Sequence, residues 1–133
     1  MGFKQQLKIR EYNWDVIIYY TVDDNQKTEI IDKLRYLNPN KETFDKLERN
    51  LINSNIDTGF IYSSFKERLS LIVIHKASSI GEFINTIAHE KNHLEMHICE
   101  ALDINPYSEE AAILSGDLAM QMLNEALYNI VEL

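Results

Sequence analysis

Residues 79–102 read SIGEFINTIAHEKNHLEMHICEAL, and this stretch decides the fold because it predicts one long helix that carries three of the four histidines of the chain. Ser79 followed three residues later by Glu82 forms a capping-box pattern, which is typical of a helix start. Apolar residues then recur at helical spacing and predict one buried face. Pro106 and the residues before it predict that the helix ends near Leu102.

Within this helix, residues 89–93 read HEKNH and match the pattern HExxH. Residues four apart lie on one face of a helix about one turn apart, so the imidazoles of His89 and His93 can reach one metal ion while Glu90 projects to the side. The single cysteine, Cys99, provides no cysteine-based zinc site, so nitrogen and oxygen must hold any metal. The structural alternative is a pair of helix histidines bonded to their neighbours.

A catalytic zinc ion normally has three protein ligands and one position for water. The metzincin pattern would need Gly and His where Met96 and Cys99 stand, so that class is excluded. His97 lies two helical turns, about 12 Å, from His89, so these two residues and His93 cannot hold one ion together. His97 is therefore either a residue that lines the pocket or a polar surface histidine, and we expect the third ligand to come from another helix.

The third ligand is expected from the last helix, which a short turn brings back beside the first as an antiparallel neighbour. Glu109 and Glu110 lie in its first turn. Ala112 and Gly116 share the helical face of Glu109, and such small residues permit close approach of two helices. This pattern predicts Glu109 as the third ligand, with Glu110 as the alternative.

The rest of the chain predicts a small sheet and further helices. Segments rich in β-branched and aromatic residues predict three strands, with residues 65–68 as a hairpin connection between the last two: 14–22, 59–64 and 69–75. Polar residues that favour helix starts predict the other helices, which begin near Asp24, Asn40 and Ser108. We therefore expect one α+β domain over residues 1–133, with a sheet of about three strands packed on helices. The strand at 69–75 is expected to form the sheet edge beside the long helix.

Composition excludes several classes of function. The chain has 133 residues, of which 13 are basic and 21 acidic, giving a net charge of −8 with both signs interspersed. This balance disfavours binding to nucleic acid or to an anionic membrane surface. No stretch approaches the ~20 apolar residues of a membrane span, and residues 1–10 lack the apolar stretch of a signal peptide. We expect a soluble, cytoplasmic protein; the sequence leaves its oligomeric state open.

These residues resemble the gluzincin class of zinc peptidases, in which HExxH is followed by a glutamate on the next helix. More narrowly, three stretches within about residues 57–120 look like short zincin peptidases carried by bacteriophages and mobile elements: GFIYSSFKERLSLIVIH, SSIGEFINTIAHEKNH and PYSEEAAILSGDL. The resemblance implies a small zincin-like fold. It also implies that His89, His93 and Glu109 bind zinc (Zn2+) and that Glu90 is the catalytic carboxylate.

The expected function is hydrolysis of peptide bonds in a peptide or protein substrate. Zinc would polarise the scissile carbonyl and activate a water molecule, while Glu90 would take the proton of that water and pass it to the leaving amine. A hydrogen-bond donor for the carbonyl oxygen is also needed. Four residues are unranked candidates for this donor: Tyr62, His75, His97 and Tyr107.

Two other classes of protein also fit parts of this pattern. In a metal-binding module without activity, zinc would only tie the two C-terminal helices together. Glu90 argues against that class, because a structural zinc site does not need it. A helical di-iron protein would need the pattern Glu-x-x-His twice, and only Glu90 and His93 provide it here.

Overall fold

The computed structural model describes residues 2–131, which form four strands, four α-helices and one short 3-10 helix. In chain order the elements are β1 (Phe3–Ile9), η1 (Arg10–Tyr12), β2 (Trp14–Tyr20), α1 (Asp24–Leu37), α2 (Lys41–Asn53), β3 (Gly59–Ser64), β4 (Leu69–Ile74), α3 (Ile80–Leu102) and α4 (Glu109–Val131). The strands form one mixed sheet in the order β1-β2-β4-β3. β2 and β4 are parallel, whereas β1 pairs antiparallel with β2 and β3 pairs antiparallel with β4.

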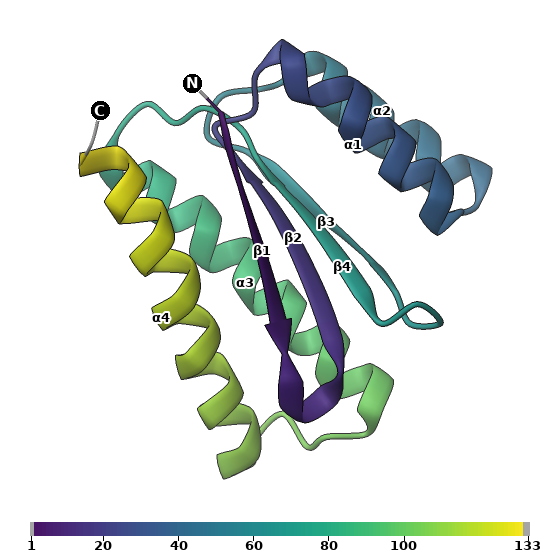
Figure 1. The fold of residues 1–133 in the computed structure, drawn as a ribbon, viewed down its shortest axis with the longest axis vertical. Helices are drawn as coiled ribbons and strands as arrows, with labels where there is room; N and C mark the ends of the chain where they lie inside the picture. Colours follow the sequence, from purple (N-terminus) through teal and green to yellow (C-terminus); the bar gives the residue numbers. More distant parts are fainter. Residues whose placement is uncertain (1, 132–133) are drawn as a thin grey trace.

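Helices cover both faces of the sheet, α1 and α2 on one face and α3 and α4 on the other (Figure 1). Successive side chains of a strand point to opposite faces, so β2 contributes to two cores. Ile18 and Tyr20 belong to the core under α3 and α4, and Tyr19 belongs to the core under α1 and α2; all three are fully buried. The α+β class and the single sheet follow from this arrangement.

The long helix predicted from residues 79–102 is confirmed as α3. Ser79 caps it by accepting a hydrogen bond from the backbone N–H of Glu82, and Asp103 ends it in a left-handed conformation. The predicted helix starts near Asp24 and Asn40 agree with α1 and α2. No helix among residues 2–131 is long and apolar enough to cross a membrane.

The prediction of about three strands was one strand short, because β1 was not recognised. Its sequence, FKQQLKI, alternates partly buried and exposed residues along most of its length. A strand with one solvent-exposed face and only three apolar residues gives a weak sequence signal. β1 pairs with β2 over its whole length and stands first in the strand order, so it forms one edge of the sheet.

The prediction that the strand at 69–75 forms the sheet edge was wrong. β4 lies between β2 and β3. Four consecutive residues of β4 are completely buried: Leu71, Ile72, Val73 and Ile74. A continuous apolar run is typical of a strand buried on both faces. The edge strand beside α3 is therefore β3.

The approach of β3 to α3 depends on Gly59, the first residue of the strand. A Cβ atom there would lie 2.4 Å from the carbonyl oxygen of Val73 and 3.5 Å from Glu90 Oε2. It would also lie 3.3 Å from Cγ2 of Thr86, one turn before Glu90 on α3. The missing side chain thus lets the edge strand lie directly against the part of α3 that carries the HExxH pattern.

Candidate metal centre

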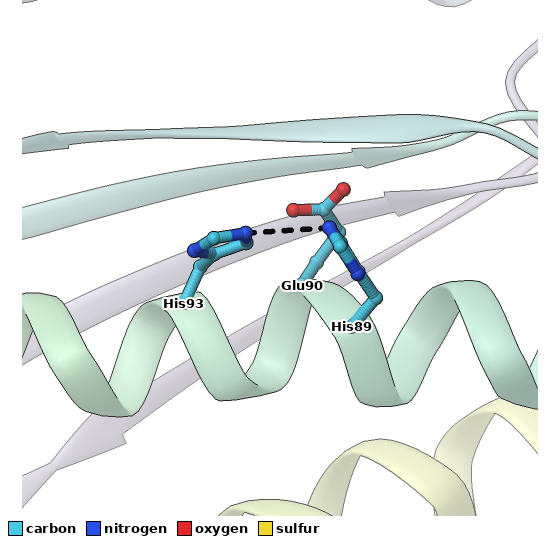
Figure 2. Close-up of side chains that lie close together, drawn as sticks. All are labelled: His89, Glu90 and His93. Carbon is cyan, nitrogen blue, oxygen red and sulfur yellow. Dashed lines mark hydrogen bonds between the residues drawn. The ribbon is translucent and has the colours of Figure 1, made fainter.

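One group of side chains on α3 has the composition and spacing of a metal site. His89, Glu90 and His93 each offer a ligand atom, and these atoms all lie within 4.8 Å of one another. The Nε2 atoms of the two histidines are 3.3 Å apart. Figure 2 shows the three side chains extending from the same side of α3. The structure therefore brings together three of the four residues predicted as site residues.

The spacing of the two imidazoles fits one tetrahedrally coordinated ion. Zinc binds histidine nitrogen at about 2.0–2.1 Å. Two nitrogens at that distance from a common ion and 3.3 Å from each other subtend an angle of about 107° at the ion, close to the tetrahedral value. Imidazole nitrogen also suits copper, iron and nickel, so the ligands fit a divalent transition metal without selecting zinc.

The three side chains differ in their contact with solvent. His89 is exposed and His93 is half-buried, whereas Glu90 is only 4% exposed. Burial raises the pKa of Glu90, and the neighbouring His89 opposes this only in part. A carboxyl group with a raised pKa accepts and releases a proton closer to neutral pH, as a general base must. The group thus combines accessible nitrogen ligands with a buried acid–base residue.

Glu109, the predicted third ligand, is not brought into this group. Lys91 Nζ contacts Ser115 Oγ of α4 at 2.9 Å. Lys91 is two residues from each histidine, which is about half a turn around the helix. α4 therefore packs on the flank of α3 that faces away from His89 and His93, and its exposed Glu109 lies at the start of that helix.

The packing argument that favoured Glu109 over Glu110 was wrong. Ala112 is exposed, and a Cβ at Gly116 would meet nothing within 4 Å, so their face of α4 points to solvent. Other residues, spaced three or four apart, form the buried face of α4: Ala111, Leu114, Leu118, Met122 and Ala126. Their apolar character was the signal in the sequence that could have identified the correct face. Glu110 is also outside the group and accepts a hydrogen bond from Tyr12 Oη at 2.9 Å.

Of the four candidate donors for a substrate carbonyl, only His97 lies beside the group. Its ring centroid is 6.3 Å from that of His93. Tyr62 packs against the core on the opposite face of the sheet, and His75 is buried with its Nε2 atom 2.7 Å from Asn50 of α2. Tyr107 is 94% exposed in the connection between α3 and α4.

His97 has partners that the sequence analysis did not identify. Its Nδ1 atom is 2.7 Å from Ser63 Oγ on the edge strand β3. Ser63 Oγ in turn contacts Ser70 Oγ on β4 at 2.6 Å. Burial, followed by the nearby His93, lowers the pKa of His97 and favours its neutral form. Ser63 shares a face of β3 with Ile61, which packs against the core under α3 and α4. A single serine in a strand carries no sequence signal for a histidine partner.

No family model, curated protein or solved structure matches this chain. The resemblance to zinc peptidases therefore depends on the motif residues quoted above. The geometry of His89, Glu90 and His93 provides the independent argument about function.

Proposed function

We propose that this protein is a metal-dependent hydrolase that cleaves peptide bonds, with His89 and His93 as metal ligands and Glu90 as the general base. The observation that carries this proposal is the 3.3 Å pair of imidazole nitrogens beside a buried carboxyl group. Zinc is the metal of choice because HExxH on a helix is a zinc-binding pattern. When bound, such an ion polarises a carbonyl group and lowers the pKa of water in its coordination sphere toward about 7.

Glu90 accounts for the proton transfers of the proposed reaction. As the water oxygen forms its bond to the carbonyl carbon, Glu90 takes a proton from that water. The same carboxyl group then gives the proton to the amide nitrogen as the carbon–nitrogen bond breaks, so that a free amine leaves; the carboxylic acid that remains loses its own proton to solvent. The raised pKa of Glu90 suits both transfers, because it brings the two protonation states closer in free energy near neutral pH.

The edge strand β3 supports a peptide as substrate. One side of β3 pairs with β4, and no strand pairs with its other side among residues 2–131. An extended peptide can add main-chain hydrogen bonds to such an edge. Because Gly59 at the start of β3 lies against Glu90, a peptide bound there would pass the proposed metal centre.

One observation favours a second candidate, a metal site without hydrolytic activity. Within residues 2–131, no further His, Cys, Asp or Glu joins His89, Glu90 and His93 in the group. Glu90 would then be the third ligand instead of the base. The two candidates predict different results for the same substitution.

The test is Glu90→Gln, measured for zinc affinity by calorimetry and for cleavage of fluorogenic peptide mixtures by the zinc-loaded protein. As a base, Glu90 can be replaced with little change in affinity, but the cleavage rate falls by about 100-fold or more. As a ligand, its replacement weakens zinc binding. Glu82→Gln, an exposed change on the same helix, is the control. No cleavage by the wild-type protein, or loss of zinc in Glu90→Gln, would contradict the proposed base.

A further inference from the structure

A chain of hydrogen bonds begins at the buried Trp14, runs through the sheet and ends at the half-buried His97. Trp14 Nε1 on β2 donates to Ser70 Oγ on β4 at 2.9 Å. Ser70 Oγ contacts Ser63 Oγ at 2.6 Å, and Ser63 Oγ contacts His97 Nδ1 at 2.7 Å. Trp14 and Ser70 are both 0% exposed. The chain thus connects the centre of the sheet, through the edge strand, to α3.

The direction of these hydrogen bonds follows from Trp14 together with the need of each buried hydrogen for an acceptor. An indole N–H only donates, so Ser70 Oγ accepts from Trp14 and keeps its own hydrogen to donate. Within the described residues, the other hydrogen-bonding group in contact with Ser70 Oγ is Ser63 Oγ. Ser70 Oγ could also accept from Ser63, but its own buried hydrogen would then have no acceptor among the described residues, so we assign Ser70 as the donor to Ser63. The hydrogen of Ser63 then points to His97 Nδ1.

Accepting at Nδ1 determines the tautomer of His97. A neutral imidazole has one N–H, and when Nδ1 accepts, the proton is on Nε2. His97 Nε2 has no hydrogen-bond partner among residues 2–131. Within that range, His75 Nδ1 is the side-chain nitrogen or oxygen that is both buried and without a partner, so His97 Nε2 is not a buried atom. His97 Nε2 is therefore accessible to solvent. A donor with a fixed direction thus lies one helical turn from His93.

We propose that His97 is the catalytic hydrogen-bond donor of this site, and that the chain from Trp14 through Ser70 and Ser63 holds it in the Nε2–H tautomer. This inference rests on the proposed hydrolysis. The Nε2–H of His97 donates to the substrate carbonyl oxygen, which gains negative charge as water attacks. A donor that is already oriented stabilises this charge without reorganising during the reaction.

The tautomer is measurable without metal, substrate or activity. Two-bond proton–nitrogen correlation spectra of the metal-free wild-type protein at pH 8 distinguish protonated from unprotonated ring nitrogens. We expect His97 with its proton on Nε2, and in Ser63→Ala a mixture of both tautomers. Ser64→Ala is the matched control, because the Ser64 hydroxyl contacts the backbone N–H of Glu67 in the hairpin turn. A wild-type His97 with its proton on Nδ1 would overturn the proposal.

The catalytic role is tested by comparing two substitutions of His97 in the zinc-loaded protein. His97→Phe keeps a ring but removes the donor, and we expect kcat to fall about 100-fold with little change in KM. His97→Gln places an amide N–H near the position of Nε2, and we expect it to restore at least a tenth of the wild-type kcat. Equal kcat values for His97→Phe and the wild type refute the role of His97. If instead Glu90→Gln leaves the rate unchanged, the proposed hydrolysis itself fails.

Discussion

Replacing Glu90 by Gln should stabilise the metal-free protein at neutral and alkaline pH. Because burial raises the pKa of Glu90 in the folded state, the folded protein holds this proton more tightly than the unfolded chain does. The stability contributed by the protonated carboxyl group is complete below the unfolded pKa of about 4.3 and is lost as pH rises through the raised folded pKa. Gln carries no charge at any pH and avoids that loss.

The size of the effect follows from the displacement of the pKa. Each unit of displacement corresponds to ~1.4 kcal/mol of unfolding free energy at a pH above both pKa values. For a domain of 133 residues, that free energy shifts the melting temperature by about 5 °C. Since Glu90 is 4% exposed, solvent screens this charge poorly. We therefore expect Glu90→Gln to melt at a higher temperature than the wild type at pH 8 and at nearly the same temperature at pH 4.

The assay is thermal unfolding of the wild type and Glu90→Gln in the presence of a chelator, followed by circular dichroism from pH 4 to pH 8. Glu82→Gln, exposed near the start of the same helix, should follow the wild-type curve across this range. The reasoning is refuted if Glu90→Gln melts at or below the wild-type temperature at pH 8. It is also refuted if the difference between the two proteins does not grow with pH.

Two further substitutions test the packing around the site. Gly59→Ala places a Cβ 2.4 Å from the carbonyl oxygen of Val73 on β4, so we expect a loss of about 1–3 kcal/mol in denaturant unfolding. A loss below about 0.5 kcal/mol would contradict this close contact of Gly59 with β4. Glu109→Ala and Glu110→Ala should leave zinc affinity within about twofold of the wild type in calorimetric titration, because α4 packs on the other flank of α3. A tenfold loss in Glu109→Ala would restore it as a ligand.

Local signals in the sequence predicted most of the elements of this fold. The capping serine and apolar spacing of α3 act within one helix, so the sequence predicted both its start and its end. The order of the strands depends on which segments meet across the sheet. The sequence did not predict the parallel pairing of β4 with β2, so β4 was placed at the edge although the apolar run at its residues 71–74 is typical of a central strand.

The candidate site shows the same difference between residues close in the sequence and contacts between distant segments. His89, Glu90 and His93 belong to one helical turn, so their spacing alone predicted the group that the structure brings together. The prediction of Glu109 depended on which face of α4 packs against α3. The apolar residues of α4 determine that face, and its small residues do not. The contact of Ser63 with His97 joins residues 34 positions apart, and no local pattern encodes it.

Zinc titration of the metal-free protein, followed by calorimetry, tests the central claim that His89 and His93 hold one ion. We expect one zinc ion per chain for the wild type, with affinity at least about tenfold weaker in both His89→Ala and His93→Ala. His97→Gln should bind as the wild type does, because His97 is not a ligand in this account. A wild-type protein that binds no zinc, or histidine variants that bind it with unchanged affinity, would contradict the claim.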